Sequence, residues 1–274
     1  MRHVPVLVIR AAGINCDEET MHCWRIAGAS PRLEHVNTVA DRPAMLDEFA
    51  IVTIPGGFSY GDDIAAGTIL AQRFLFELAD PLRRFVERGG GVLGICNGFQ
   101  ALMKAGLLPG DPFRREDATV TYNESARFEA RWVRLQVCAN RCPFLSKVAS
   151  MDRESTSGPT GEHRAPVIEM PVEHAEGRVV TNSDSVTQRL ETEGRIALRY
   201  IDANGRHDRF PANPNGSTAG IAGLTDSTGR VFGLMPHPDR HFDHTQHPQW
   251  TRRKPEGPAD GLSIFINAVE YWRS

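Results

Sequence analysis

Hydrophobic positions in the first hundred residues form short, nearly unbroken runs, separated by polar and glycine-rich segments. Val4–Arg10, Ile51–Ile54 and Val92–Ile95 are runs of this kind, rich in valine, leucine and isoleucine. Such runs are typical of central parallel strands that are covered on both faces. We therefore expect buried parallel strands at these three places, and a further strand over Arg32–Val36.

Between these runs the apolar residues follow helical spacing. Helices are expected from Asp17 to about Ala27, over Ile64–Glu77, over Pro81–Arg88 and over Phe99–Ala105. The resulting order βαβαβαβα predicts the α/β class. More specifically, we expect a doubly wound, flavodoxin-like, mostly parallel sheet with added antiparallel strands.

The rest of the chain supplies those additional strands. Ala130–Val137 alternates apolar and polar residues, which predicts an antiparallel strand with one face towards solvent. Ser155–Arg164 is polar and predicts an exposed, mobile loop, and Ser263–Trp272 predicts a final helix. Further short strands are expected at Arg178–Val180, Ile196–Tyr200, Thr218–Leu224 and Val231–Met235. Since no internal repeat or linker is visible, we expect residues 1–274 to form one domain.

Composition narrows the choice of partners and compartment. The formal net charge of −3 gives no electrostatic reason to expect nucleic acid or an anionic membrane surface as a partner. No apolar run approaches the roughly 20 residues of a membrane-spanning helix, and the N-terminus does not have the pattern of a signal peptide. The five cysteines are an odd number at irregular spacing, unlike a disulfide framework. A reducing cytoplasm is the expected location.

Cys96 is the first candidate for chemistry. It stands between a strand pattern and a helix pattern, with Gly94 and Gly98 two residues away on either side. This G-x-C-x-G arrangement is that of a nucleophile elbow, with cysteine in place of serine. The N-terminus of the following helix favours a thiolate there. The alternative is a buried structural cysteine.

A glycine-rich loop, residues 55–63, follows the strand Ile51–Ile54, at the sheet edge where ligands bind in open parallel sheets. It lacks the lysine and hydroxyl of a phosphate-binding P-loop. We therefore expect it to supply backbone N–H groups that stabilise an oxyanion, from Gly57 and Phe58, together with the N–H of Asn97.

His237 is the candidate base for Cys96. It follows a predicted strand at the same edge, between two prolines that favour extended backbone, so Asp239 is expected to approach its imidazole. The alternative is a surface turn that holds an incidental histidine. His241, His244 and His247 follow closely, but their spacing does not repeat on one helical face. No metal site is expected.

Together these residues resemble a known family. Cys96, His237 and a carboxylate two residues later are similar to the triad of class I glutamine amidotransferases. Over nearly its whole length the chain resembles, more specifically, the glutaminase subunit of phosphoribosylformylglycinamidine synthase, in a longer variant. The motifs that carry this resemblance are Arg10-x-x-Gly13-x-Asn15-Cys16-Asp17, Pro55 to Asp62, Cys96-Asn97-Gly98-Phe99-Gln100, Ala105 to Gly110, Asn123-x-Ser125-x-Arg127-Phe128-Glu129, Ala175-Glu176-Gly177-Arg178, Asn213 to Ser217 and Met235-Pro236-His237-Pro238.

The resemblance implies that Cys96 attacks the side-chain amide of glutamine to form a thioester, with His237 as base, and that ammonia is released. It also implies that the amino-acid end of glutamine is held by residues in and near two of these motifs. These residues are Gln100, Asn123, Ser125, Arg127 and Phe128. Asp239 departs from the family, which usually has glutamate at this position.

The resemblance further implies a synthetase partner that uses ATP and Mg²⁺ and receives the ammonia, and a small third subunit. No ATP site is visible in this chain, and we expect it to hold no cofactor. Two alternatives are a free-standing cysteine hydrolase or deglycase on the same fold, and a catalytically weak docking subunit if Asp239 cannot replace glutamate.

Overall fold

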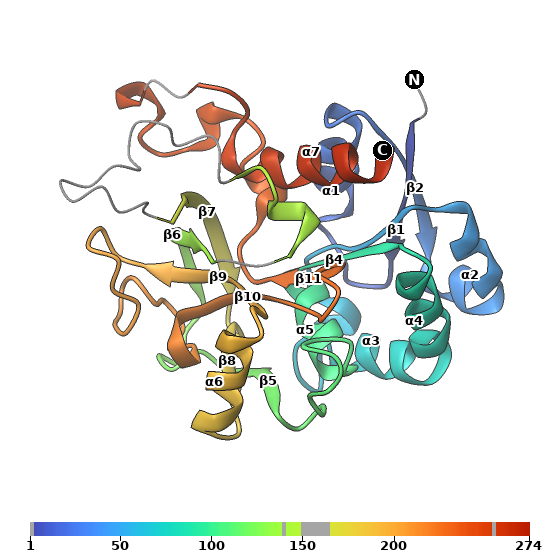
Figure 1. The fold of residues 1–274 in the computed structure, drawn as a ribbon, viewed down its shortest axis with the longest axis horizontal. Coiled ribbons are helices and arrows are strands. Elements are labelled where there is room, and N and C mark those ends of the chain that lie inside the picture. Colours follow the sequence, from blue (N-terminus) through green and yellow to red (C-terminus); the bar gives the residue numbers. More distant parts are fainter. Residues whose placement is uncertain (1–2, 139–140, 149–164, 254–255) are drawn as a thin grey trace.

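A nine-stranded mixed sheet forms the centre of the molecule (Figure 1). The computed structural model describes residues 3–138, 141–148, 165–253 and 256–274. Five neighbouring strands are parallel, in the spatial order β2-β1-β3-β4-β11. This is the strand order of flavodoxin-like sheets, so the predicted fold class is confirmed. The five strands are β1 (Val4–Arg10), β2 (Ala29–His35), β3 (Ile51–Ile54), β4 (Gly91–Ile95) and β11 (Val231–Leu234).

The sheet continues beyond β11 with antiparallel strands, which make up a larger part of it than the sequence suggests. They are β10 (Ile221–Thr225), β9 (Ile196–Ile201), β6 (Glu129–Val137) and β7 (Val167–His174). Strand β7 is absent from the sequence-based expectation because Pro171 interrupts its pattern. Proline is tolerated there because β7 is an edge strand. The expected strand over Thr218–Leu224 is shorter, since Thr218–Gly220 forms a 3-10 turn.

Helices cover both faces of the parallel half of the sheet. Figure 1 shows α1 (Asp17–Ile26) and α7 (Asp260–Arg273) on one face. There Trp24 packs edge-on against Phe265, with 4.9 Å between ring centroids. The opposite face carries α3 (Thr68–Arg73), α4 (Ala79–Glu87) and α5 (Asn97–Lys104). Two further helices are α2 (Val36–Asp41) and α6 (Asp184–Thr192). Within the described ranges, no helix has both the length and the apolar character needed to cross a membrane.

The helix expected over Ile64–Glu77 begins later, at Thr68. The preceding loop is folded over α5 instead. Asp62 accepts a hydrogen bond from the Gly67 N–H at 3.0 Å and another from the Asn97 side chain at 3.0 Å. A second, two-stranded sheet pairs β5 (Ala118–Thr121) with β8 (Arg178–Thr181). The expected loop over Ser155–Arg164 lies outside the described residues.

The carboxyl ends of the parallel strands bring distant segments together at one edge. The residues after β1 pair with the loop after β3 through a bridge between Ile14 and Gly57. The end of β4 is tied to β11 by a hydrogen bond of 2.8 Å from the Cys96 N–H to the Leu234 carbonyl. All the candidate catalytic residues lie at this edge.

Candidate active site

Cys96 occupies the sharp turn between β4 and α5. Its backbone has φ 49° and ψ −103°, a conformation that a non-glycine residue adopts only where the surroundings enforce it. A Cβ at Gly98 would lie 2.0 Å from the Ile54 carbonyl oxygen, and one at Gly94 would lie 2.5 Å from Leu102. Both positions therefore require glycine, and the predicted nucleophile-elbow geometry is present.

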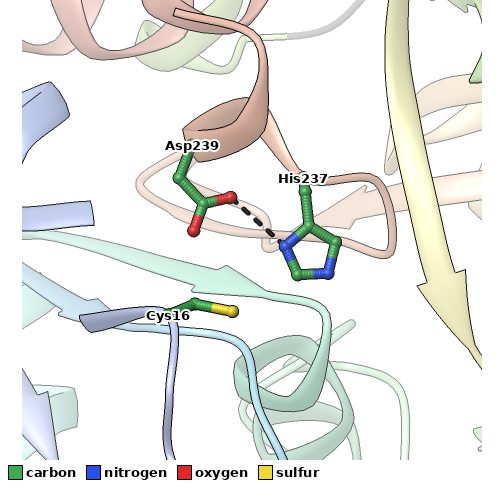
Figure 2. Close-up of side chains that lie close together, drawn as sticks. All are labelled: Cys16, His237 and Asp239. Atoms are coloured by element: carbon green, nitrogen blue, oxygen red, sulfur yellow. Dashed lines mark hydrogen bonds and ion pairs between the residues drawn. The ribbon is translucent and has the colours of Figure 1, made fainter. Parts of the chain in front are cut away.

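His237 and Asp239 form a hydrogen-bonded pair just beyond β11. His237 Nδ1 lies 3.2 Å from Asp239 Oδ1 (Figure 2). The residues 238–240 form a 3-10 turn, so this turn brings the two side chains together, in place of the extended backbone we expected. Thr20 in α1 donates a hydrogen bond of 3.0 Å to Asp239 Oδ2, which fixes the carboxylate from its other side.

The site is buried, and its charged groups influence one another. Cys96 is 5%, His237 2% and Asp239 0% exposed. Burial by itself lowers the pKa of His237, but the charge of Cys96 and the hydrogen bond with Asp239 outweigh it and raise that pKa well above 6.5. The imidazolium form of His237 is therefore favoured beside Cys96.

A second cysteine, Cys16, lies against the His237–Asp239 pair. Figure 2 shows its sulfur directed towards the imidazole, from the segment that leads into α1. One donor atom each of Cys16, His237 and Asp239 lies within 4.8 Å of the others, the one such group of metal-type donors found in the described ranges. Burial raises the pKa of the Cys16 thiol, which favours its neutral form.

The backbone N–H groups expected to stabilise the oxyanion, those of Gly57, Phe58 and Asn97, are not all free to do so. The Phe58 N–H donates to the Gly13 carbonyl at 2.9 Å. It is therefore not free, and the prediction that it stabilises an oxyanion is wrong for this structure. Asn97 is the first residue of α5, where an α-helix leaves its N–H groups without intrahelical acceptors. Gly57 has a φ of 137°, and a Cβ there would lie 2.7 Å from the Asn15 nitrogen, so this loop also needs glycine.

Two of the residues expected to bind glutamine use their side-chain amides to hold the protein together. Asn123 donates to the carbonyls of Arg127 and His174, both at 2.8 Å, and its oxygen faces the Gly177 N–H and His174 Nδ1. These four bonds exhaust an asparagine side chain. Gln100 donates to the Glu176 carbonyl and accepts from the Asn97 side chain at 2.9 Å. Gln100 keeps one further donor and one further acceptor position, and the expectation that Gln100 and Asn123 hold the amino-acid end of glutamine stays a prediction.

The other three expected substrate residues lie at the surface. Ser125, Arg127 and Phe128 are exposed and line a hollow of about 530 Å³ together with Glu129, Arg131 and Phe210. Ser125 Oγ donates to Glu129 at 3.1 Å. Across the described part of the chain, no hydrogen bond joins these residues to Cys96, His237 or Asp239.

The immediate neighbours of the two thiols are residues that the sequence analysis did not assign. The Glu173 carbonyl lies 3.7 Å from Cys96 Sγ, and Arg240 Nη2 lies 3.3 Å from Cys16 Sγ. Arg240 also pairs with Glu173 and with Glu19 of α1. Cys16 and Arg240 stand in or beside motifs that the sequence singled out, whereas nothing local marks Glu173 or Glu19.

A doubly wound sheet with a cysteine at the strand–helix turn, and a histidine–carboxylate pair beyond the adjacent strand, defines a protein of the class I glutamine amidotransferase type. Comparison with family models supports this: residues 3–272 match the CobB/CobQ-like glutamine amidotransferase domain. The most similar relatives identify the subfamily within this class. A phosphoribosylformylglycinamidine synthase subunit PurQ from Dehalococcoides mccartyi is 40% identical over 275 residues, covering 100% of this chain and 99% of that protein.

Other relatives and solved structures agree with this assignment. PurQ from Methanococcus maripaludis is 34% identical, with 97% of each chain covered. A chain in the structure of PurLQS from Thermotoga maritima superposes with a TM-score of 0.69 at 29% identity, covering 98% of this chain and 99% of that one. A putative GMP synthase subunit from Thermoplasma acidophilum, with a TM-score of 0.54 and 12% identity over 100% of this chain and 96% of that one, shares the fold. The chain therefore belongs to the glutamine amidotransferase family of PurQ subunits.

Proposed function

We propose that this chain is the glutaminase subunit of phosphoribosylformylglycinamidine synthase, which hydrolyses glutamine and supplies ammonia to de novo purine biosynthesis. One observation carries the proposal above all: a chain that matches PurQ relatives from end to end has a cysteine at the nucleophile elbow, at the same sheet edge as a histidine–aspartate pair. The family assignment supports the substrate, and the geometry supports the chemistry.

In this mechanism Cys96 attacks the carboxamide carbon of glutamine. His237 holds the thiol proton and passes it to the departing nitrogen, so that ammonia leaves and a γ-glutamyl thioester remains. His237 then accepts a proton from water, whose oxygen attacks the thioester and releases glutamate. Asp239 orients the imidazole and stabilises its charged form. The N–H groups of Gly57 and Asn97 stabilise the oxyanion of both tetrahedral intermediates.

The ammonia requires an acceptor that is protected from water, where it would be protonated and lost as a nucleophile. The relatives are named as subunits, and the Thermotoga structure contains PurL and PurS together with PurQ. We therefore propose two partners for this chain, an ATP-dependent synthetase and a small third subunit. ATP and Mg²⁺ are assigned to the synthetase, and no cofactor is assigned to this chain.

A cytoplasmic location fits the same proposal. Cys16, Cys23 and Cys96 are free thiols, and all three are buried. Free thiols of this number are typical of a reducing compartment. The proposed nucleophile also requires a reducing compartment, because an oxidised Cys96 could not attack glutamine.

Ammonia release from glutamine tests the proposal, measured for the purified chain alone and then with the candidate synthetase and third subunits. We expect low activity alone and strong activation in the complex, with ammonia transferred to the formylglycinamide ribonucleotide. Equal activity in both settings would favour an independent hydrolase. Lack of activity in either would favour a catalytically weak docking subunit.

A further inference from the structure

Asn97 uses its side chain as well as its backbone at the active-site edge. It is the first residue of α5, and it is 0% exposed. Its side-chain oxygen accepts a hydrogen bond of 3.2 Å from the Ser59 N–H. Its side-chain nitrogen donates to Asp62 Oδ1 at 3.0 Å and to Gln100 Oε1 at 2.9 Å. Asn97 therefore ties the start of the helix to two points of the glycine-rich loop that follows β3.

The backbone of this loop needs support from its neighbours. Tyr60 and Asp62 have φ values of 54° and 52°, in the left-handed region that residues with side chains rarely adopt. Gly57 and Gly61 have positive φ values as well. Sparsely populated backbone conformations persist where surrounding contacts enforce them. The position of the loop is therefore determined by its contacts rather than by its own backbone preference.

Two segments provide those contacts. The N–H groups of Phe58 and Tyr60 donate to carbonyls of the segment after β1, residues 12–13, at 2.9 Å and 2.7 Å. These bonds fix the loop to that segment but not to α5. Within the described residues, the hydrogen bonds that join residues 57–62 to α5 all run through the side chain of Asn97.

The two N–H groups proposed to stabilise the oxyanion belong to the two elements that Asn97 joins. Gly57 lies in the loop, two residues before Ser59, and the Asn97 N–H lies at the start of α5. Both must point at one oxygen atom, and such donors are effective when they are held in place before the reaction. A displacement of about 1 Å near the reacting atoms can lower a rate by about 10²-fold.

We propose that the Asn97 side chain is a positioning group for the oxyanion site. It holds the loop that contains Gly57 at the distance from α5 at which both N–H groups reach the same oxygen. Asp62 acts through this amide, because its Oδ1 accepts from Asn97 and also from the Gly67 N–H, at 3.0 Å each. This inference rests on the proposed glutaminase function, which it deepens by assigning a buried side chain to transition-state stabilisation.

Steady-state glutamine hydrolysis by the complete complex tests the assignment with Asn97→Ala. Because the oxyanion forms after the substrate has bound, kcat should fall by roughly 10- to 100-fold while KM changes by less than about 3-fold. Asn267→Ala is the matched control. Asn267 is also a buried helical asparagine, and its amide donates to the Phe144 carbonyl at 3.1 Å, in contact with α7 rather than with the loop. This control should leave kcat unchanged.

Asp62→Ala and Asp62→Asn test the same link from the side of the loop. Alanine removes the oxygen that both the Asn97 amide and the Gly67 N–H use, so kcat should fall as it does in Asn97→Ala. Asparagine keeps an oxygen there and should restore most of the lost activity. These two variants test the assignment independently if Asn97→Ala folds poorly.

Alkylation of Cys96 separates the oxyanion site from damage to the nucleophile. Iodoacetamide reacts with a thiolate by displacement of iodide at a saturated carbon, so no oxyanion forms. We therefore expect Cys96 to be alkylated at the same rate in Asn97→Ala and in the unmodified protein. Mass spectrometry of the labelled peptide, from the complete complex, measures this rate.

Three results would overturn the assignment. They are an unchanged kcat in Asn97→Ala, a rate of Cys96 alkylation that falls in parallel with kcat, and an equal loss of kcat in Asn267→Ala. Each of them leaves the glutaminase function standing. Absence of glutamine hydrolysis by the unmodified complex contradicts the proposed function itself.

Discussion

Thr20 donates a hydrogen bond of 3.0 Å to Oδ2 of Asp239, the carboxylate whose other oxygen lies 3.2 Å from His237. The same hydroxyl proton is also directed at the Cys16 carbonyl, 2.6 Å from Thr20 Oγ1, so the two acceptors share it. Helix α1 thereby fixes the acid that orients the proposed base, although 219 residues separate Thr20 from Asp239. The aspartate needs this support because its short side chain reaches the imidazole only from a fixed backbone position.

Thr20→Val tests this support, since valine keeps the branched shape and removes the donor. We expect kcat for glutamine hydrolysis to fall by roughly 10-fold, as a net loss of one buried hydrogen bond of about 1 to 2 kcal/mol predicts. Thr20→Ser retains the hydroxyl and is the control. Equal losses in the two variants would show that the methyl group, rather than the hydrogen bond, matters.

Asp239→Glu tests whether the site is built for the shorter acid. Asp239 is fully buried and bonded on both sides. An additional methylene must therefore displace packed neighbours, which is unfavourable in a dense interior. We expect lower glutaminase activity in Asp239→Glu. A large gain in activity would instead support the catalytically weak docking subunit.

Asp239→Asn complements that variant, because it keeps the shape and removes the charge. The proposed mechanism predicts a loss of kcat on the order of 10² to 10⁴-fold, as expected when a histidine loses the carboxylate that orients it. The pKa of His237 should fall towards its ordinary value. The pH profile of kcat/KM for glutamine, measured in the complex, reports that change.

Cys96→Ser separates a nucleophile from a structural cysteine. In the assembled synthase, glutamine-dependent synthesis should fall by at least about 10³-fold, while synthesis from added ammonium salt continues. The variant is close in size, so the strained turn at this position should persist. Loss of both activities would mean that Cys96 maintains the fold or the subunit contact. Cys142→Ser, at a buried cysteine away from the site, is the control.

The elbow could be predicted from the sequence because its determinants are local. Gly94 and Gly98 are required by contacts within the strand–turn–helix unit or with the adjacent strand, and the change of hydrophobic period at Cys96 marks the junction. The doubly wound α/β class also followed from the alternation of strands and helices, whereas the order of the strands comes from the structure. Strand β7 could not be predicted in this way, because Pro171 interrupts its pattern of apolar residues.

The surroundings of the thiols could not be predicted in the same way. The contacts of Glu19 and Glu173 with Arg240 span 221 and 67 residues, and no local signal distinguishes these glutamates from solvent-exposed ones. For Asn123 the sequence marked the residue but did not show what its side chain contacts. Its motif contributes to the family resemblance in the sequence, but only the structure reveals that its amide holds the chain segments 174–177 and 127 in place.

His174 predicts how stability depends on pH. It is buried beside the site, its Nδ1–H donates to Asn123 Oδ1 at 3.0 Å, and burial lowers its pKa to about 3. Its unfolded value is near 6.5, so between pH 6.5 and pH 3 the unfolded chain binds more protons than the folded one. Stability therefore falls as the pH falls through this window, by up to about 1.4 kcal/mol per pH unit.

His174→Gln removes that titration at the cost of an altered hydrogen bond. We expect the variant to be less stable than the unmodified chain at pH 7.5, and the difference in free energy of unfolding to shrink by about 1 kcal/mol at pH 5.5. Urea unfolding at the two pH values measures the difference. His22→Gln, at an exposed histidine, is the control. A difference that stays constant or grows at pH 5.5 would show that His174 is not held neutral in the folded protein.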